Sequence, residues 1–391
     1  MTILKVIFFI SLAVVFYTYL GYGIVLWLMV KIKTLFVKPE KYESEEIPEV
    51  TLFIAAYNEE SVIEEKMKNC RELNYPKDKL NIVWVTDGSN DGTNDMLARY
   101  DDATVLFDEQ RRGKTAAINR GMPFIKTPIV IFTDANTMIN SGAVKEIVKC
   151  FDNPRVGCVA GEKRIAVQEK DGAAAGGEGL YWKYESTLKS LESRLKTAVG
   201  AAGELFAIRR DLFTVMDNDT LLDDFILSMR IAAQNYKIEY CDRAYAIESG
   251  SADMKEEEKR KVRIAAGGLQ SIWRLRSLLN IFRYGMMSFQ YISHRVLRWS
   301  LTPLLLFLLL PLNIIIVAME PHQWLYTVIL ALQILFYAAG LWGYYLSTKA
   351  INNKLLYIPY YFLFMNINVI KGFFYLRRKK GNGAWEKAKR A

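Results

Sequence analysis

The chain has 391 residues and a formal net charge of +9, and 51% of its residues are hydrophobic. This length exceeds one compact core, and the composition divides the chain into a polar middle between apolar flanks. Four cysteines without C-x-x-C spacing and only two histidines disfavour a disulfide framework and a zinc site, so a metal in the middle would be oxygen-ligated Mg²⁺ or Mn²⁺. The basic residues lie beside the apolar segments rather than in one groove, which argues against nucleic acid and favours membrane lipids as partners.

The apolar flanks are long enough to cross a membrane. Residues 6–30, 301–319 and 323–348 contain no charged residue, and a spanning helix needs about 20 such residues. The first run is longer than a signal-peptide core of about 7–15 residues, so we interpret it as a retained anchor. We therefore expect an integral membrane protein, in a bacterial inner membrane, with the polar middle in the cytosol.

A fourth apolar segment, residues 355–376, is interrupted by Asn366, Asn368 and Lys371. If it spanned the membrane, the basic run 377–380 would lie outside, against the positive-inside tendency. Either this segment is interfacial or re-entrant, or the tendency fails here.

The polar middle alternates short apolar strands with amphipathic helices. Strands are predicted at 50–56, 80–86, 104–107, 129–133, 204–208 and 237–240, with helices at 59–73, 91–100 and 114–124 and another beginning near Asp223. This alternation predicts an α/β domain with a mostly parallel sheet and right-handed crossovers. The glycine- and alanine-rich residues 171–179 read as a loop, either mobile near the site or a plain surface loop.

Residues 269–298 mix aromatic and aliphatic residues with arginines. This mixture indicates helices that lie in the headgroup plane, the alternative being an ordinary surface helix of the polar domain. The predicted organisation is an anchor and linker at 1–47, a cytosolic domain at 48–267, interfacial helices at 268–299, and a membrane region with a basic tail at 300–391.

Acidic and polar side chains follow several predicted strands. Asp87 ends one strand, and Asp134 and Asn136 end another, so both groups reach the carboxyl edge of the sheet, where open α/β sheets bind ligands. Two oxygen groups at i, i+2 can hold a divalent ion against a diphosphate. The alternative, an Asx-type turn, accounts for one such motif more easily than for two.

Two further segments fit a nucleotide. Residues 55–60 follow the first strand with Tyr57 and Glu59, where a planar ring can hold a nucleobase, although Asn and Glu there also cap a helix start. Residues 111–115 put cationic groups and a glycine before another helix, which suits phosphate. A charged helix start is also ordinary solvated surface.

These motifs, in this order, resemble family 2 glycosyltransferases. The resemblance rests on Tyr57-Asn-Glu59, Asp87-Gly-Ser89, Gly113-Lys114, Asp134-Ala-Asn136, Asp223-Asp224 and Arg260-Lys-Val-Arg263, and spans about residues 48–270. The chain is similar to membrane-embedded synthases of cellulose, chitin, hyaluronan and poly-N-acetylglucosamine. The resemblance implies a nucleotide-sugar-binding domain of the GT-A type, flanked by transmembrane helices.

The resemblance also implies roles for individual residues. Asp224 would be the general base, with Asp223 beside it in place of the commoner Glu. The segment Ala56, Tyr57 and Glu59 with Asp87 would hold the nucleoside, and Asp134 with Asn136 would hold the metal and diphosphate. Lys114, Arg260 and Arg263 would also contact the nucleotide. Ile264 replaces a Trp that lies under the acceptor sugar in processive synthases, which leaves processivity open.

The function implied is inverting, metal-dependent transfer from a UDP-sugar to a hydroxyl acceptor at the cytosolic membrane face. UDP-N-acetylglucosamine and UDP-glucose are the expected donors, and the acceptor is a growing polysaccharide or a lipid-linked glycan or glycolipid. Export or accessory subunits would be further partners. Two alternatives stay open: transfer to polyprenyl phosphate, in which the Asp223-Asp224 pair would be idle, and a non-catalytic scaffold with the same fold.

Overall fold

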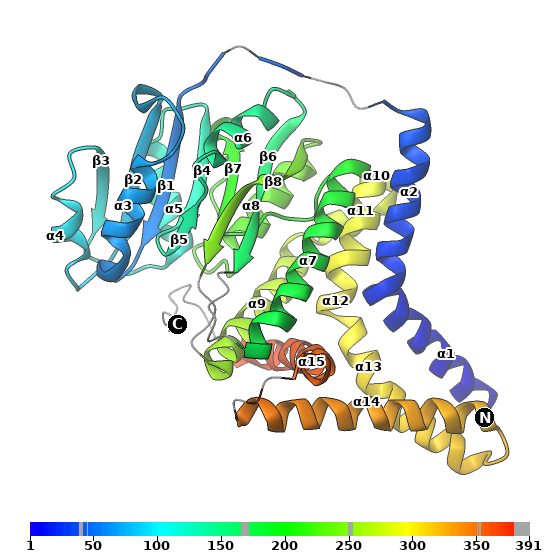
Figure 1. Ribbon diagram of the computed structural model, residues 1–391. Coiled ribbons are helices and arrows are strands. Elements are labelled where there is room, and N and C mark those ends of the chain that lie inside the picture. The colour runs from blue at the N-terminus through cyan, green and yellow to red at the C-terminus, as the bar shows by residue number, and fades with distance from the viewer. Residues whose placement is uncertain are drawn as a thin grey trace.

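A computed structural model describes residues 1–38, 42–44, 46–165, 172–248, 253–349, 351 and 353–378, with the side chains of 172–181 and Lys354 left out. The polypeptide forms an α/β domain that carries one mixed sheet, and a set of long helices beside it (Figure 1). The linker that follows the first long helix crosses over to the first strand of the sheet. The two parts correspond to the polar middle and the apolar flanks of the sequence.

The sheet has eight strands in the order β3-β2-β1-β4-β7-β6-β8-β5. The strands are β1 (Val50–Ala56), β2 (Leu80–Asp87), β3 (Ala103–Asp108), β4 (Ile129–Asp134), β5 (Thr137–Ile139), β6 (Val156–Ile165), β7 (Leu205–Arg209) and β8 (Lys237–Glu248). Neighbours from β3 to β4 pair in parallel, as do β6 and β8, whereas β7 and β5 pair antiparallel. The expected α/β sheet is confirmed, and it is mixed because β7 runs against both of its neighbours.

Most predicted strands lie within a residue or two of their expected bounds, but β6 and β5 were not predicted. Strand β6 contains Gly157, Gly161 and a charged end, which break the period-two pattern. Both glycines are needed for packing, because a Cβ at Gly157 would lie 2.7 Å from the Ile231 side chain and one at Gly161 would lie 2.8 Å from Leu205. The backbone of β6 therefore needs glycine at these two positions because neighbouring side chains approach it closely, and these glycines obscure the strand pattern in the sequence.

Helices cover both faces of the sheet (Figure 1). They are α3 (Ile63–Arg71), α4 (Thr93–Leu97), α5 (Lys114–Gly121), α6 (Ala143–Cys150) and α8 (Asp223–Ala233), with short 3₁₀ turns η2 (Glu60–Val62), η3 (Lys77–Lys79), η4 (Met122–Phe124) and η5 (Arg210–Leu212). One core lies between the sheet and α3 and α6. The second core extends from α5 and α8 to Tyr291 and Trp299, so the helical segment that contains these two residues shares a core with the sheet.

The glycine- and alanine-rich segment is helical, so the predicted loop is wrong. Helix α7 (Gly172–Leu195) runs through residues 172–179, whereas Asp171 lies outside the described residues. Packing overrides the low helix propensity of glycine here, since Leu188 and Leu191 of α7 pack against Tyr22 and Leu26 of the first long helix.

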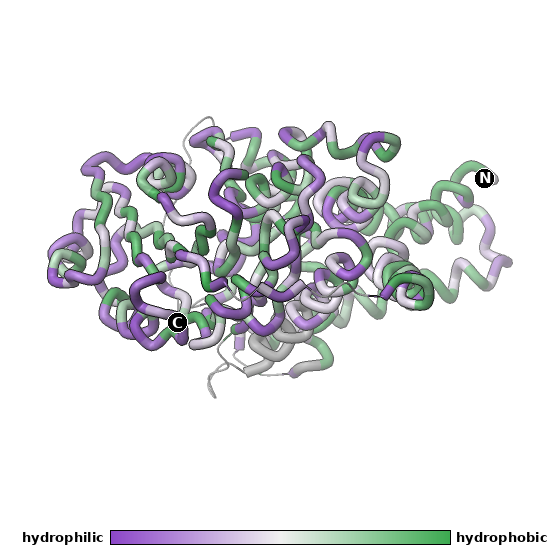
Figure 2. The backbone as a smooth tube through the Cα atoms, turned by 90° about the horizontal axis from the view of Figure 1, so that it is seen from above, coloured by the Kyte–Doolittle hydropathy of each residue, from purple (hydrophilic) through white to green (hydrophobic). Residues whose placement is uncertain are grey.

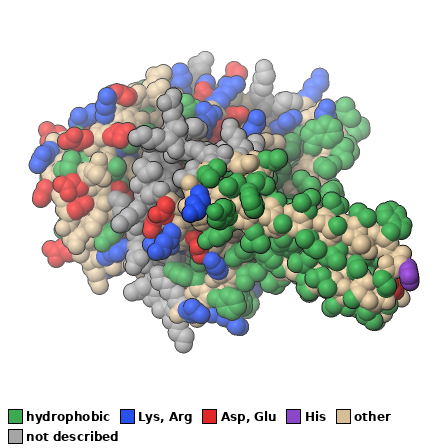
Figure 3. Space-filling model, turned by 60° about the horizontal axis from the view of Figure 1, so that its bottom comes forward, with side chains coloured by type: hydrophobic (Ala, Val, Ile, Leu, Met, Phe, Trp, Pro, Cys, Tyr) green, Lys and Arg blue, Asp and Glu red, His purple; other side chains and the backbone are tan. Residues whose placement is uncertain are grey.

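Among the described residues, three helices are long and apolar enough to cross a membrane by length and composition. They are the bent helix Thr2–Phe36, formed by α1 (Thr2–Phe16), the π-helical turn η1 (Tyr17–Gly21) and α2 (Tyr22–Phe36), then α13 (Leu301–Met319) and α14 (Trp324–Thr348). Figure 2 shows hydrophobic colour along the helices at the N-terminal end, and Figure 3 shows an arm of hydrophobic side chains projecting from the domain. The α1 and α13 helices pack side by side, with Lys5 Nζ 2.5 Å from Glu320 Oε2.

The fourth apolar segment forms α15 (Lys354–Arg378), which packs on α9 (Met254–Arg274) of the catalytic side as well as on α14. The contact with α9 is close, because a Cβ at Gly372 would lie 2.6 Å from Ala265 Cβ. Lys371 of α15 also pairs with Glu258 of α9 at 2.5 Å. Among the described helices, α15 is not one of those that are long and apolar enough to span. The interfacial placement of this segment stays a prediction.

Short helices join α9 to α13. They are η6 (Arg276–Leu279), α10 (Ile281–Tyr284), α11 (Met286–Tyr291), the π-helical turn η7 (Ile292–Val296) and α12 (Leu297–Trp299). Phe282 is 99% exposed and Trp273 is 70% exposed, and the Arg276 guanidinium lies 4.9 Å from the Trp273 ring centre. Exposed aromatic residues beside arginines are typical of helices at a membrane surface.

Candidate active site

The Asp87 carboxylate binds the loop before α5. It accepts hydrogen bonds from the backbone N–H of Arg112 at 3.0 Å and of Gly113 at 2.7 Å. Gly88 follows in the left-handed region with φ +67°, and a Cβ there would lie 2.6 Å from the Arg111 backbone nitrogen. This turn requires glycine. It brings the end of β2 against the loop that precedes α5, and the two together form one side of the site.

The end of β1 is joined to the same turn. Asn58 has φ +52° and donates from its backbone N–H to Ser89 Oγ at 3.1 Å, and the N–H of Glu59 donates to Thr93 Oγ1 at 2.9 Å. The Arg111 guanidinium lies 3.7 Å from the centre of the Tyr57 ring. Ala56, Tyr57 and Glu59 therefore lie beside Asp87, as expected for one binding site.

We expect Tyr57→Leu to weaken nucleotide affinity about tenfold or more, because stacking of a base on an aromatic ring contributes about 1–3 kcal/mol. The Arg111 guanidinium already stacks on the flat ring of Tyr57. Titration of nucleoside diphosphate against the purified protein measures the effect. Tyr57→Phe is the matched control, since it retains the ring, and equal losses in both variants would contradict stacking.

Lys114 connects the strand end of β4 to the start of α8. Its Nζ lies 2.6 Å from Asp134 Oδ1 and 4.0 Å from Asp223 Oδ2. Burial alone would lower the pKa of Lys114, but the carboxylates of Asp134 and Asp223 raise it above its ordinary value. Lys114 is therefore a cation at neutral pH, placed where a diphosphate would need positive charge.

Asp224 lies beside this cluster in the first turn of α8. A Cβ at Gly203 would lie 3.4 Å from Asp224 Oδ2 and 3.5 Å from Lys114 Nζ, so Gly203 keeps the space beside both groups open. Burial and the neighbouring Asp223 raise the pKa of Asp224 to about 7. A carboxylate whose pKa lies near the operating pH is suited to accept a proton.

The two arginines of α9 have different surroundings. Arg263 is half-buried. Burial together with Arg260 lowers the pKa of Arg263, while Asp134, Asp223 and Asp224 raise it. Arg260 lies 3.5 Å from carboxylate oxygens of both Glu204 and Glu248. Both arginines stay predicted contacts of the diphosphate.

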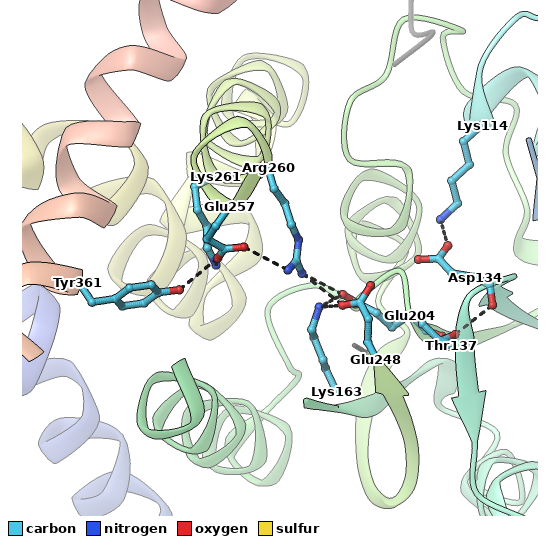
Figure 4. Close-up of polar contacts among 10 residues, drawn as sticks. All are labelled: Lys114, Asp134, Thr137, Lys163, Glu204, Glu248, Glu257, Arg260, Lys261 and Tyr361. Carbon is cyan, nitrogen blue, oxygen red and sulfur yellow. Dashed lines mark hydrogen bonds and ion pairs between the residues drawn. The ribbon is translucent and has the colours of Figure 1, made fainter. Parts of the chain in front are cut away.

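Arg260 belongs to a buried charge network, defined as Lys163, Glu204, Glu248, Glu257, Arg260 and Lys261 (Figure 4). Lys163 of β6 pairs with both Glu204 and Glu248. Glu257 extends the network to Tyr361 of α15, whose hydroxyl lies 3.4 Å from Glu257 Oε1. The network therefore connects the sheet, α9 and the membrane-side helix α15.

The network also reaches the catalytic carboxylates. Glu204 follows Gly203, and although burial alone would raise its pKa, Lys163 and Arg260 hold the pKa of Glu204 below its ordinary range. The resulting negative charge contributes to raising the pKa of Asp224. Sequence reasoning did not find Lys163, Glu204 or Glu248, because ion pairs between distant segments leave no local pattern.

A divalent cation would have few protein ligands here. Among the described residues, no group of three or more His, Cys, Asp or Glu side chains could hold a metal ion. Asp134 offers a carboxylate at the strand end, and its backbone carbonyl accepts from Thr137 Oγ1 at 3.0 Å, which forms the tight turn that contains Asn136. These oxygen donors fit Mg²⁺ or Mn²⁺ held jointly with a diphosphate, since such ions commonly complete their shell with phosphate oxygens and water.

An aromatic and acidic side suited to a nucleoside, a cationic side suited to a diphosphate and a carboxylate of raised pKa lie together, which is the arrangement that a nucleotide-sugar transferase site would need. Residues 51–216 match the family model described as Glycosyl transferase family 2. Residues 51–216 of the chain are therefore similar to a family 2 glycosyltransferase domain.

Curated relatives agree with this class. The chain is 28% identical over 254 residues to a beta-monoglucosyldiacylglycerol synthase of Nostoc sp., covering 60% of this chain and 53% of that protein. It is 25% identical over 245 residues to a poly-beta-1,6-N-acetyl-D-glucosamine synthase of Staphylococcus aureus, covering 59% of this chain and 57% of that protein. The chain therefore spans a little over half the length of these relatives.

The fold also matches a solved structure over nearly its whole length. The mannosyltransferase PcManGT of Pyrobaculum calidifontis, solved in complex with GDP-Man and Mn²⁺, aligns with a TM-score of 0.71 and 22% identity. The alignment covers 96% of this chain and all of that chain. At this identity the likeness establishes the fold, including the arrangement of the long helices beside the domain.

Proposed function

We propose that the protein transfers a sugar from a nucleotide-diphosphate donor to a hydroxyl acceptor with inversion of the anomeric centre, at the cytosolic face of a membrane. The observation that carries this proposal is Asp224, a carboxylate with its pKa raised to about 7 beside the Lys114–Asp134 ion pair. A sugar or glycerol hydroxyl is a poor nucleophile until a base takes its proton. A polyprenyl-phosphate acceptor needs no such base, so we do not propose it.

In the proposed reaction, Asp224 accepts the proton of the acceptor hydroxyl as its oxygen attacks the anomeric carbon. The bond from that carbon to the diphosphate breaks, and the nucleoside diphosphate leaves with the electron pair. Lys114 and Arg263 stabilise the negative charge that develops on it, as fixed cations do in sites that exclude water. Tyr57 and Asp87 orient the nucleoside so that the anomeric carbon faces Asp224.

A divalent cation held by Asp134, Asn136 and the diphosphate would add Lewis-acid stabilisation of the leaving group. The Asp134 carboxylate, which lies 2.6 Å from Lys114 Nζ, supplies the oxygen donors that this part of the proposal needs. The solved neighbour is a complex with GDP-Man and Mn²⁺, which supports a divalent ion in such a fold.

The donor and acceptor classes follow from the relatives. These relatives are a glucosyl-lipid synthase and a poly-N-acetylglucosamine synthase, so UDP-glucose and UDP-N-acetylglucosamine are the first donors to test. The GDP-Man bound to the solved neighbour adds GDP-mannose. Release of nucleoside diphosphate from each donor, with Mn²⁺, Mg²⁺ or chelator, tests the proposal in lipid-supplemented detergent. Release that needs one donor and a divalent ion supports it, and absence of release with every donor contradicts it.

We propose that the catalytic domain and the C-terminal end of α15 lie on the same, cytosolic side. If the three candidate helices each span the membrane, the turn between α13 and α14 lies on the side opposite to the catalytic domain. The end of α14 then lies in the cytosol, and an interfacial α15 keeps Arg377 and Arg378 on that side, as the positive-inside tendency requires.

In intact cells, we expect a cysteine introduced by His322→Cys to react with a membrane-impermeant maleimide, whereas one introduced by Arg378→Cys reacts only after the cells are opened. Both positions are exposed, so differences in labelling report the side of the membrane. The parent protein, which has four cysteines in its catalytic part, gives the background. Labelling of residue 378 in intact cells would show that α15 spans.

A further inference from the structure

A fully buried lysine lies beside the turn that carries Asp134 and Asn136. Lys66 of α3 is 0% exposed, so its ammonium is enclosed by protein. Its Nζ donates to the Thr133 hydroxyl at 3.1 Å and to the backbone carbonyl of Thr137 at 2.6 Å. These two threonines flank the turn, and one cation therefore binds the end of β4 and the start of β5 together.

A chain of hydrogen bonds leads from Lys66 to the backbone of Asp134. An ammonium can only donate, so Thr133 Oγ1 accepts from Lys66 and keeps its own hydrogen for another acceptor. The hydroxyls of Thr133 and Thr137 lie 3.0 Å apart, and Thr137 Oγ1 donates to the Asp134 carbonyl at 3.0 Å. In Figure 4, Asp134 contacts Thr137 through this carbonyl and Lys114 through its carboxylate. The lysine therefore fixes the turn that presents the Asp134 carboxylate.

A second side chain of α3 binds the same segment. Asn69 lies three residues after Lys66, on the same side of the helix. Its side-chain amide donates to the Ile139 carbonyl at 2.8 Å and accepts from the Ile139 backbone N–H at 3.0 Å. Strand β5 has only three residues, and it pairs with β8. The two side chains of α3 therefore hold residues 133–139 at both ends, where the strand pairing of the segment itself is short.

Folding stability alone does not account for a lysine at this place. Both oxygens that Lys66 Nζ binds in the described part of the chain are neutral, and burying a charge among neutral groups costs free energy of folding. Burial lowers the pKa of Lys66 to about 8, although Cys70 and Asp134 oppose this change, so the side chain stays largely an ammonium at neutral pH. An apolar residue would fill the same space at a lower cost. The charge therefore calls for a role beside Asp134.

We propose that Lys66 is a positioning residue for the divalent cation and the diphosphate of the donor. Through the hydroxyls of Thr133 and Thr137, it holds Asp134 and Asn136 at the spacing that the ion needs, and it touches neither the ion nor the substrate. Residues that orient metal ligands in this way change metal affinity about 10–100-fold. The inference rests on the proposed function, in which Asp134 and Asn136 hold the ion, and adds a residue that lies outside the motifs of the site.

Nucleotide binding measures this role without sugar transfer. The full-length protein in neutral detergent is titrated calorimetrically with UDP and with GDP, each in Mn²⁺ and in chelator, and the nucleotide that the parent binds more tightly is used for the variants. Lys66→Met removes the ammonium, and Thr137→Val removes the hydroxyl that donates to Asp134. Lys68→Met is the matched control, because the Lys68 side chain of the same helix is 76% exposed. The thermal-unfolding midpoint without ligand shows whether each variant folds.

We expect Mn²⁺ to raise the nucleotide affinity of the parent and of Lys68→Met by the same factor. In Lys66→Met the affinity in Mn²⁺ should fall about tenfold or more, while the affinity in chelator stays that of the parent. Thr137→Val should show a loss that is likewise confined to Mn²⁺. A lysine with a purely structural role would instead give a lower unfolding midpoint and an unchanged effect of Mn²⁺.

Four results would overturn the inference. They are no effect of Mn²⁺ on the parent, parental affinity of Lys66→Met in Mn²⁺, an equal loss in Mn²⁺ and in chelator, and the same loss in Lys68→Met. If Lys66→Met does not fold, Thr137→Val decides between these outcomes. Failure of the proposed function is a separate result, because it appears as the absence of nucleoside diphosphate release from every donor, whereas these titrations need neither acceptor nor turnover.

Discussion

The Asp224→Asn variant is expected to transfer sugar at least about a hundredfold more slowly than the parent, since a positioned general base contributes about 10²–10⁴-fold. The amide keeps the size of the side chain and its place in the first turn of α8, but it cannot accept the proton of the acceptor. Binding of nucleoside diphosphate should persist, because Tyr57, Asp87, Lys114 and Arg263 are unchanged. Product formation and nucleotide titration in one preparation measure both effects.

The pH profile gives a second measure of the same residue. Burial and Asp223 raise the pKa of Asp224 to about 7, so the base is ionised above that pH and protonated below it. The rate of the parent should therefore fall as the pH is lowered through about 7. Glu204→Gln removes a nearby negative charge, which should lower the pKa of Asp224 and shift this fall in rate to lower pH. A flat profile across this range would contradict the assignment of Asp224 as the base.

The control for Asp224→Asn is Asp211→Asn. The Asp211 side chain is 90% exposed and pairs with Arg210 at 3.6 Å, outside the site. The Asp211→Asn variant should transfer sugar at the rate of the parent and bind nucleotide with the same affinity. If both substitutions slowed transfer equally, the loss would not be specific to the base.

Lys163→Met should lower the free energy of unfolding by about 3–5 kcal/mol, as expected when one partner of a buried ion pair is removed. The Lys163 side chain is 2% exposed and pairs with both Glu204 and Glu248. Its loss removes one cation from both carboxylates, each of which also lies 3.5 Å from Arg260. Denaturant unfolding of the full-length protein, followed by the fluorescence of its tryptophans, measures the change.

Lys149→Met is the matched control for Lys163→Met. The Lys149 side chain is 56% exposed and lies 3.5 Å from Glu146, and an exposed pair of this kind contributes only about 0–1 kcal/mol. Equal effects of the two substitutions would show that the charge network does not hold α9 to the sheet. A large effect of Lys163→Met alone would support it.

The parallel half of the fold could be predicted from sequence because its patterns are local. Residues 50–56 form a strand with the predicted bounds, and α5 begins at Lys114 as expected. Strand β6 and helix α7 could not be predicted in the same way. In β6, glycine is required by close packing against another element, such as Leu205 beside Gly161, and this removes the side-chain pattern that predicts a strand. In α7, the glycines and alanines of residues 172–179 give no apolar period that would predict a helix.

The site residues likewise divide into those that local sequence patterns could predict and those that only the folded structure shows. Asp87, Asp134 and the first turn of α8 lie at ends of elements, so order along the chain was enough to group them. Lys163 and Glu248 are 85 residues apart, and their pairing depends on how β6 and β8 align. The raised pKa of Asp224 depends on Glu204 and on burial, which only the folded structure defines.

The configuration of the product tests the central claim most directly. If a hydroxyl activated by Asp224 displaces the diphosphate in one step, the new glycosidic bond has the anomeric configuration opposite to that of the donor. Nuclear magnetic resonance coupling of the anomeric proton, measured on product from the preferred donor, distinguishes the two forms. We expect inversion, and a product that retains the donor configuration would contradict the direct role of Asp224.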